Sequence, residues 1–189
     1  MVNLGMSLRA LHRYEEAEET LRPAAIMAEK HFGPEHTRTL AAKMTLGWTL
    51  SNLAWSGRVS ATDATRAKAA EGEQFLRDLL AVRTTSAPPD NPNLITPHAL
   101  IAHAELVRLA CESPAPEKAL AIERLRGLET RLIDAHNRLS KLPPEQYAVI
   151  QRPGAPRPDE VLDRLYTLWN ELEPGTGKEA LARYLHARG

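Results

Sequence analysis

Two stretches of the chain, 42 residues apart, share one pattern of large and small residues, and this repeat limits the possible folds more than any other feature. Asn3-Leu4-Gly5-x-x-Leu8 matches Thr45-Leu46-Gly47-x-x-Leu50. A second match joins residues 17–22 to residues 72–77, at a spacing of 55. Units that recur at such a period are typical of solenoids, in which each unit packs against its neighbours. The longer second spacing predicts an insertion near residues 56–68.

The repeated units are predicted to be helical. Aromatic residues make up only 5% of the chain, and the one short β-like run, residues 147–150, is not stable as a lone strand. The 14 prolines, which helix interiors disfavour, cluster between stretches with helical spacing of leucines. We therefore expect helices at about residues 2–11, 14–32, 38–54, 62–84, 96–111, 116–142 and 159–172, and one more after residue 176.

Local signals predict where some of these helices begin or bend. Thr96 before Pro97 has the pattern of an N-cap followed by a first-turn proline. Residues 176–179 have the spacing of a capping box. Pro23 lies inside the helix expected at 14–32, where it removes one backbone hydrogen bond, so we expect a kink there.

The first repeat contains a leucine–glycine pair, two further leucines and two alanines in a fixed order: Leu4-Gly5, Leu8, Ala17, Leu21 and Ala24. This order resembles the tetratricopeptide repeat. The resemblance implies an all-α, right-handed solenoid of antiparallel helix pairs, with a divergent helical cap at its C-terminal end. The small residues at 5, 17 and 24 would let two helices approach closely, and Leu4, Leu8 and Leu21 would fill the space between them.

The period and the connector resemble one subtype of this repeat. Residues 13–18 and Gly33-Pro34-Glu35-His36 are similar to the kinesin-light-chain type, which also occurs in bacterial multi-repeat proteins and in C-terminal regions of some bacterial serine/threonine kinases. The resemblance divides residues 1–142 into units at 1–37, 38–93 and 94–142. Residues 143–189 are expected to be a proline-rich connector with capping helices. Because the chain begins inside a first helix, we expect it to continue a longer array or to start near an older domain boundary.

Charge and hydropathy argue against several classes of protein. Lys and Arg together number 24, as do Asp and Glu, so a nucleic-acid-binding module is not expected. No apolar stretch approaches the roughly 20 residues of a membrane span, and the N-terminus lacks the pattern of a signal peptide. Cys111 is the one cysteine, which we expect to be a small buried residue. These features favour a cytoplasmic protein.

The sequence contains no complete motif for catalysis, a cofactor or a metal. Residues 175–178 look like the end of a phosphate loop, but Leu172 replaces its first glycine and Glu179 its last hydroxyl residue. His98 and His103 are five residues apart, which does not match the four-residue spacing of a helical zinc pair. We therefore expect no enzyme activity, no cofactor and no metal.

The resemblance implies where a partner would bind. In tetratricopeptide proteins the positions one and four residues after the small residue of the Leu-Gly pair face a concave groove. Carried over, with a neighbour of the second unit added, these positions are Met6, Arg9, Trp48, Ser51, Asn52, Glu105 and Arg108. Trp48 has the character of an interface hot spot, unless the insertion or the next unit covers it.

These observations leave two functions open. The first is an adaptor or scaffold that binds a peptide or protein partner in the groove, without catalysis. The alternative is a C-terminal regulatory or interaction segment of a larger bacterial serine/threonine kinase or signalling protein.

Overall fold

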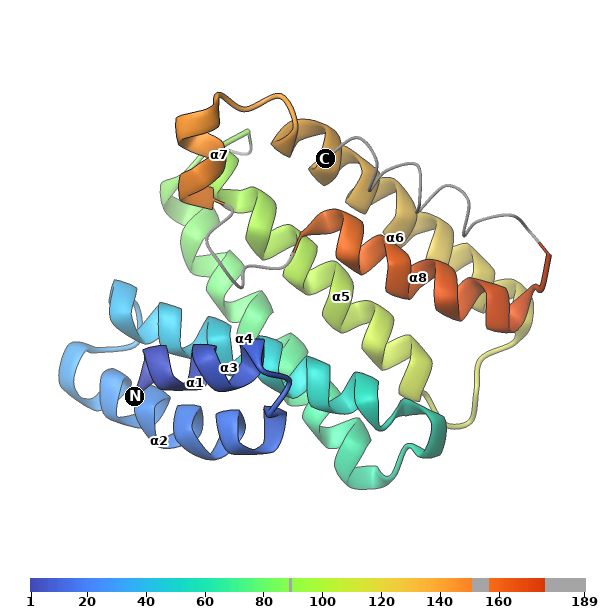
Figure 1. The fold of residues 1–189 in the computed structure, drawn as a ribbon, viewed down its shortest axis with the longest axis horizontal. Helices are drawn as coiled ribbons and strands as arrows, with labels where there is room; N and C mark the ends of the chain where they lie inside the picture. Colours follow the sequence, from blue (N-terminus) through green and yellow to red (C-terminus); the bar gives the residue numbers. More distant parts are fainter. Residues whose placement is uncertain (89, 151–156, 176–189) are drawn as a thin grey trace. The chain divides into compact units, whose positions relative to one another are not determined.

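The computed structural model describes residues 1–88, 90–150 and 157–175. Figure 1 shows that these residues form helices joined by short connections. The α-helices are α1 (Val2–Ala10), α2 (Tyr14–Phe32), α3 (Thr37–Ser56), α4 (Asp63–Ser86), α5 (Ile95–Cys111), α6 (Lys118–Leu139), α7 (Pro144–Ile150) and α8 (Pro158–Leu172), and the short 3-10 helices are η1 (Arg58–Ser60) and η2 (Pro92–Leu94). The described part of the chain contains no strand, and the predicted all-α helical-repeat fold is confirmed. The helix expected after residue 176 lies outside the described residues.

The chain divides into two compact units, residues 1–89 and residues 90–189. In the first unit, α3 packs against both α2 and α4, and α1 packs mainly against α2. In the second unit, α8 packs against α6 and α5. This division differs from the predicted boundary after residue 142, because α8 shares a core with the helices that precede that boundary. The predicted subdivision into three repeats remains a prediction.

Glycines bring the helices of the first unit into close contact, as the sequence predicts. A Cβ atom on Gly5 would lie only 2.4 Å from Leu21 Cγ. A Cβ atom on Gly47 would lie 3.0 Å from the Gly72 carbonyl oxygen and 3.2 Å from Leu76 Cγ. Gly5 and Gly47 correspond in the first match, and Leu21 and Leu76 correspond in the second. The two helix pairs therefore repeat one packing arrangement in three dimensions.

The core of the first unit is built from leucines and alanines of its first three helices. Its buried members are Leu8, Ala17, Leu21, Ala25, Ala42, Leu46 and Leu50. The prediction that Leu4 fills the space between helices is wrong, because its side chain is 57% exposed. Leu46, its counterpart, is 1% exposed. The reason is that α3 lies between two helices, whereas α1 has its main neighbour, α2, on one side.

The segment that connects α3 to α4 contains the predicted insertion. Here α3 continues to Ser56, η1 follows, and α4 begins at Asp63. Thr62 caps α4, since its hydroxyl accepts a hydrogen bond from the Thr65 backbone N–H at 3.2 Å. Most of the inserted residues therefore make α3 and α4 longer than α1 and α2, and only a few lengthen the connection between the two helices.

The start of α5 differs from the prediction. Thr96 is not the N-cap, because α5 begins at Ile95, directly after η2. The N-cap of α5 is Leu94, which makes no side-chain capping bond. Asn91 caps the preceding η2, since its side chain accepts a hydrogen bond from the Asn93 backbone N–H at 2.9 Å. Pro97 lies in the first turn of α5, where its missing N–H removes no helical hydrogen bond.

Helix α7 lies in a segment that the sequence predicts to be irregular. It begins at Pro144, a favourable first position for a helix. Its residues Tyr147 and Ile150 are half-buried and pack against a small core cluster of α5 and α6 residues. Tertiary packing therefore stabilises a helix of only 7 residues.

Two polar contacts join α8 to its neighbours in the second unit. The Tyr166 hydroxyl donates to Glu129 Oε1 of α6 at 3.0 Å. On α5, His103 Nε2 accepts a hydrogen bond from the Arg164 guanidinium at 2.5 Å. Burial of the His103 imidazole and the charge of Arg164 hold the pKa of His103 well below its usual value, so the ring is neutral. Cys111, at the end of α5, is buried as predicted.

Candidate functional site

Two of the predicted partner-binding residues, Arg9 and Trp48, stack on each other. The Arg9 Cζ atom lies 3.6 Å from the centre of the Trp48 ring. Arg9 belongs to α1 and Trp48 to α3, the first helices of the two pairs, so the contact joins corresponding helices of the repeat. A guanidinium over an indole ring is a favourable cation–π pair. Trp48 stays half-buried, while Arg9 is buried.

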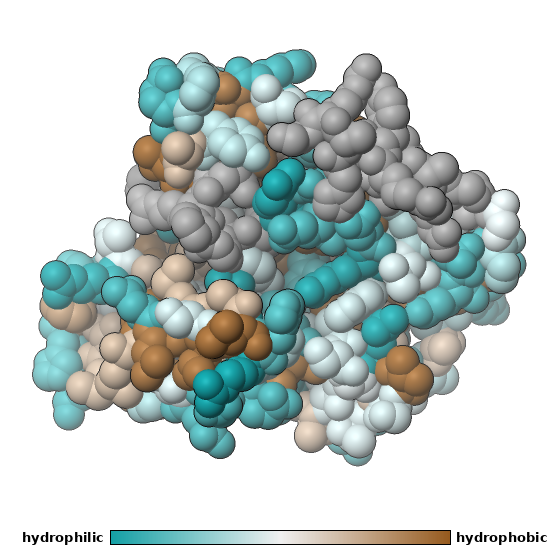
Figure 2. All heavy atoms as spheres, viewed as in Figure 1, coloured by the Kyte–Doolittle hydropathy of each residue, from teal (hydrophilic) through white to brown (hydrophobic). Residues whose placement is uncertain are grey.

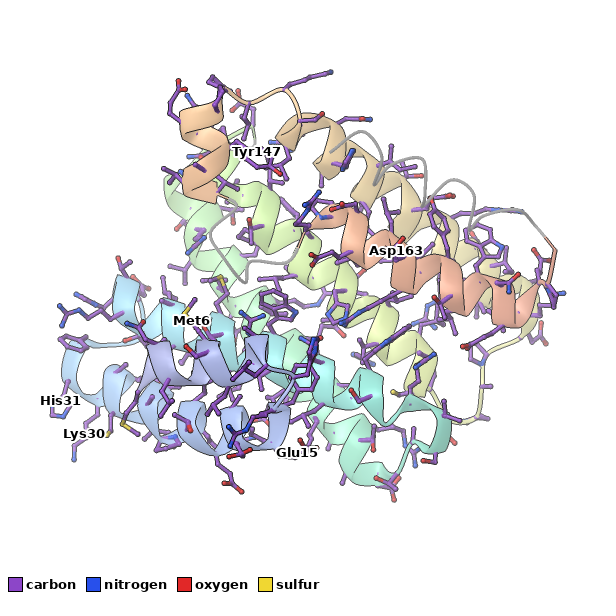
Figure 3. All side chains as sticks on the ribbon, in the orientation of Figure 1. Met6, Glu15, Lys30, His31, Tyr147 and Asp163 are labelled. Atoms are coloured by element: carbon purple, nitrogen blue, oxygen red, sulfur yellow. The ribbon has the colours of Figure 1, made fainter. Side chains whose placement is uncertain are left out.

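Met6, another predicted residue, is half-buried on α1. It is three residues before Arg9, so the two side chains lie on neighbouring parts of the same helix face. In Figure 3, Met6 projects from α1, whereas Glu15, Lys30 and His31 project from α2, on the other side of the first unit. The face with Met6 is thus carried by α1, the first helix of the first pair.

Ser51 and Asn52 do not lie on an accessible surface, which corrects their prediction as contact residues. Ser51 is fully buried, and its hydroxyl donates to the Gly47 carbonyl oxygen at 3.0 Å. Asn52 is 3% exposed, and its Nδ2 donates to the Trp48 carbonyl oxygen at 2.9 Å. For Ser51 the physical reason is the close approach of α4, since a Cβ atom on Gly72 would lie 2.9 Å from Ser51 Oγ.

The two predicted residues of the third repeat, Glu105 and Arg108, lie on α5 in the second unit. Glu105 is half-buried and pairs with the guanidinium of Arg131 on α6. Arg108 is exposed. Within the second unit, Glu105 therefore helps to join α5 to α6, and Arg108 presents a charged side chain on the surface.

A second tryptophan–arginine stack, between Trp55 of α3 and Arg58 of η1, was not predicted. The Arg58 Cζ atom lies 4.1 Å from the centre of the Trp55 ring, and Arg58 Nη1 donates to the Trp55 carbonyl oxygen at 3.4 Å. Trp55 follows Trp48 by seven residues, which is two helical turns, so both rings lie along one side of α3. That spacing is visible in the sequence and is the signal that the prediction missed.

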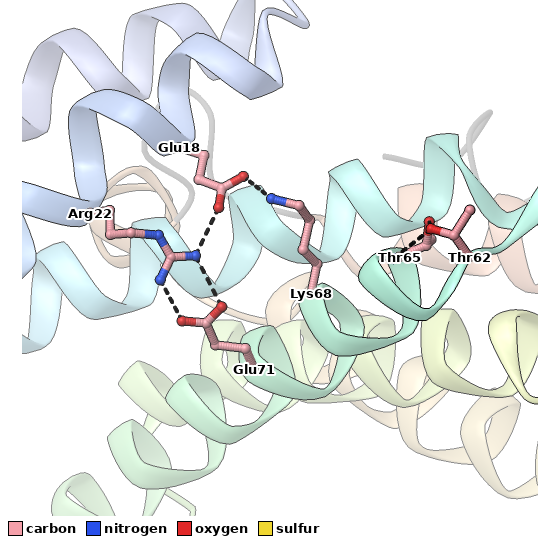
Figure 4. A network of polar contacts seen from close by, with 6 residues as sticks. All are labelled: Glu18, Arg22, Thr62, Thr65, Lys68 and Glu71. Carbon is pink, nitrogen blue, oxygen red and sulfur yellow. Dashed lines mark hydrogen bonds and ion pairs between the residues drawn. The ribbon is translucent and has the colours of Figure 1, made fainter.

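A network of charged side chains joins α2 to α4, the second helices of the two pairs (Figure 4). Arg22 lies between two carboxylates, 2.7 Å from Glu18 and 2.6 Å from Glu71. Glu18 also pairs with the ammonium group of Lys68. Burial disfavours the Glu18 carboxylate, but the hydrogen bonds from Lys68 and Arg22 outweigh it and lower the pKa of Glu18. The network fixes the position of one helix pair against the next.

Among the residues that the structure describes, no group of three His, Cys, Asp or Glu side chains is arranged to hold a metal ion. None of the described helices combines the length and the apolar character needed to cross a membrane.

The comparison with protein families gives one match. Residues 1–38 match the family model of the tetratricopeptide repeat. These residues span α1, α2 and the first residues of α3. No curated protein and no solved structure matches the chain. The kinesin-light-chain subtype and the association with a kinase remain predictions.

Proposed function

Because residues 1–38 match the family model of the tetratricopeptide repeat, we propose that the chain is a non-catalytic module that binds a peptide or protein partner. The partner would lie in a concave groove lined by the first helices of the pairs, α1 and α3. Solenoids of stacked helix pairs curve, and their curvature creates extended concave surfaces for binding.

The observation that carries this proposal is the stack of Arg9 on Trp48. The guanidinium, 3.6 Å from the ring centre, restricts the rotation of an indole that remains half-buried. A rigid aromatic side chain loses little conformational entropy on binding, so it contributes strongly to affinity. Interfaces take much of their binding free energy from such residues, with tryptophan and arginine among the most frequent.

The proposal gives each predicted residue a separate role. Met6 and Trp48 are the accessible apolar contacts, and Arg9 positions the Trp48 ring. Asn52 positions the same residue through its hydrogen bond to the Trp48 carbonyl oxygen. Glu105 and Arg108 are proposed as polar contacts within the second unit. Ser51 supports the packing of α3 on α4.

A peptide-display selection against the wild-type chain tests the proposal. Peptides that bind should lose at least about 10-fold in affinity on Trp48→Ala, because truncation of a hot-spot residue typically costs about 2 kcal/mol or more. Met6→Glu should weaken the binding of the same peptides, since it replaces an accessible apolar side chain by a carboxylate. Affinities are measured by fluorescence anisotropy, and circular dichroism verifies that each variant folds.

The matched control is the double variant Lys30→Ala with His31→Ala, which changes exposed side chains of α2 on the other side of the unit. It should bind the selected peptides as the wild type does. If the selected peptides bind Trp48→Ala and Met6→Glu with undiminished affinity, the α1–α3 face is not the binding site.

A further inference from the structure

The α1 segment carries an exposed apolar stripe, which we define as Met1, Leu4 and Leu11. These side chains are 62%, 57% and 66% exposed. Met1 and Leu11 are the capping residues at the two ends of α1, and spacings of three and seven residues place all three side chains along one side of this segment. Figure 2 shows hydrophobic residues gathered over α1. Large apolar side chains aligned in this way indicate a helix face that contacts a partner.

The internal repeat shows what the corresponding face of α3 contacts. Leu46 corresponds to Leu4 and is 1% exposed. It belongs to the core cluster that also contains Ala17, Leu21 and Ala25 of α2. The α3 counterpart of Leu4 is therefore buried in a core shared with the second helix of the preceding pair.

A second position supports this correspondence. Lys43 corresponds to Met1, and its ammonium group lies 2.8 Å from the Glu29 carboxylate of α2. Lys43 and Leu46 are one turn apart on α3, and both contact α2. Met1 and Leu4 thus repeat, on α1, the positions that form the α2–α3 interface.

We propose that the α1 stripe docks an amphipathic helix of a partner protein that resembles α2. Its contact face would carry the small–large–small order of Ala17, Leu21 and Ala25, four residues apart. At the position of Glu29 in α2, the partner helix would carry an uncharged residue. The reason is that Met1, which is apolar, occupies the position of Lys43, the residue that pairs with Glu29 in the α2–α3 interface. The docked helix would continue the interface that already exists between α2 and α3.

This surface is separate from the groove of the proposed function. Met6 follows Leu4 by two residues, and two residues correspond to about 200° around an α-helix. The stripe and the groove therefore lie on nearly opposite sides of α1. Binding at the stripe and binding in the groove can therefore be tested separately, and the failure of one does not imply the failure of the other.

The probe for the stripe is a synthetic helical peptide with the sequence of residues 14–32 and the change Glu29→Leu, titrated against the full chain. Fluorescence anisotropy should show saturable binding. In the full chain, Leu4→Glu should weaken this binding at least about 10-fold. The matched control is Val59→Glu, since Val59 is an exposed apolar residue of η1, and this variant should bind normally. In the peptide, Leu21→Glu should abolish binding.

Three results would overturn the proposal. The first is equal binding of the peptide to wild type and Leu4→Glu, with both shown to be folded by circular dichroism. The second is no binding to the wild type at all. The third is self-association of the chain in sedimentation experiments that Leu4→Glu abolishes, which would assign the stripe to a second copy. Trp48→Ala should leave binding of this peptide unchanged, so the result is independent of the groove.

Discussion

Gly47 of α3 and Gly72 of α4 face each other across the contact between these two helices. A Cβ atom on Gly47 would lie 3.0 Å from the Gly72 carbonyl oxygen, and one on Gly72 would lie 2.8 Å from the Gly47 carbonyl oxygen. The two backbones can approach this closely only because neither residue has a side chain. The contact sets the distance between α3 and α4, and with it the position of the α3 face that carries Trp48.

Gly72→Ala should therefore destabilise the chain. The new methyl group would meet the Gly47 carbonyl oxygen, a backbone atom that cannot rotate away, so we expect a loss of about 1–3 kcal/mol in the free energy of unfolding. Urea denaturation measures this change. Gly127→Ala is the control, because its Cβ atom would meet nothing within 4 Å and alanine favours the helix. A Gly72→Ala variant as stable as the wild type would contradict the close contact.

Truncation of the two corresponding leucines should have unequal effects. Leu46→Ala removes a side chain that is 1% exposed and should cost about 2–5 kcal/mol in unfolding free energy. Leu4→Ala removes a side chain that is 57% exposed and should change stability by about 0.5 kcal/mol or less. Chemical denaturation of both variants checks the difference. Equal losses would mean that Leu4 is buried in solution, contrary to the structure.

Removal of the Glu18 charge should weaken the link between α2 and α4. Glu18→Gln leaves Arg22 with Glu71 but deprives Lys68 of its carboxylate partner, and we expect a loss of about 1 kcal/mol. Glu16→Gln, which changes an exposed pair with Arg13, should have a smaller effect. Because the pKa of Glu18 is lowered on folding, its contribution is present above its unfolded pKa of 4.5 and disappears as the pH falls through the folded value. Stability of the variant measured from pH 7 to pH 3 should therefore fall less steeply than that of the wild type.

His103 should make the second unit sensitive to acid. Its pKa is well below 6.5 in the folded state, so the unfolded chain binds one more proton once the pH drops below that value. Stability should be constant above about pH 7 and should then fall by up to about 1.4 kcal/mol per pH unit. His103→Gln, which keeps an acceptor for Arg164, should flatten this dependence. Denaturation curves at pH 7, 6 and 5 compare the two proteins, and identical slopes would contradict the burial of a neutral imidazole.

The positions of the long helices could be predicted from the sequence because their signals are local. Leucine spacing marks the buried face of a helix, and prolines mark its ends. Helix α7 could not be predicted in this way, because it depends on contacts of Tyr147 and Ile150 with residues of α5 and α6. The same limit explains the wrong N-cap at Thr96, since η2 leads directly into α5 and its last residue, Leu94, is the N-cap of α5.

The candidate site was predicted in part. The repeat positions pointed to Arg9 and Trp48, which stack, and to Met6 on the same face of α1. The same rule pointed to Ser51, which is buried against α4. A position in a repeat gives the direction of a side chain on its helix, but a neighbouring helix decides whether solvent reaches it.

The sequence by itself determined the helical class, the correspondence between the two helix pairs and the small residues at their contacts. These properties depend on spacing along one helix or between matching segments, and the chain carries that information directly. The tertiary structure alone decided that Leu46 is buried and Leu4 exposed, although the two occupy the same position of the repeat. The physical reason is that burial depends on which helices surround a residue, and α3 has neighbours that α1 lacks.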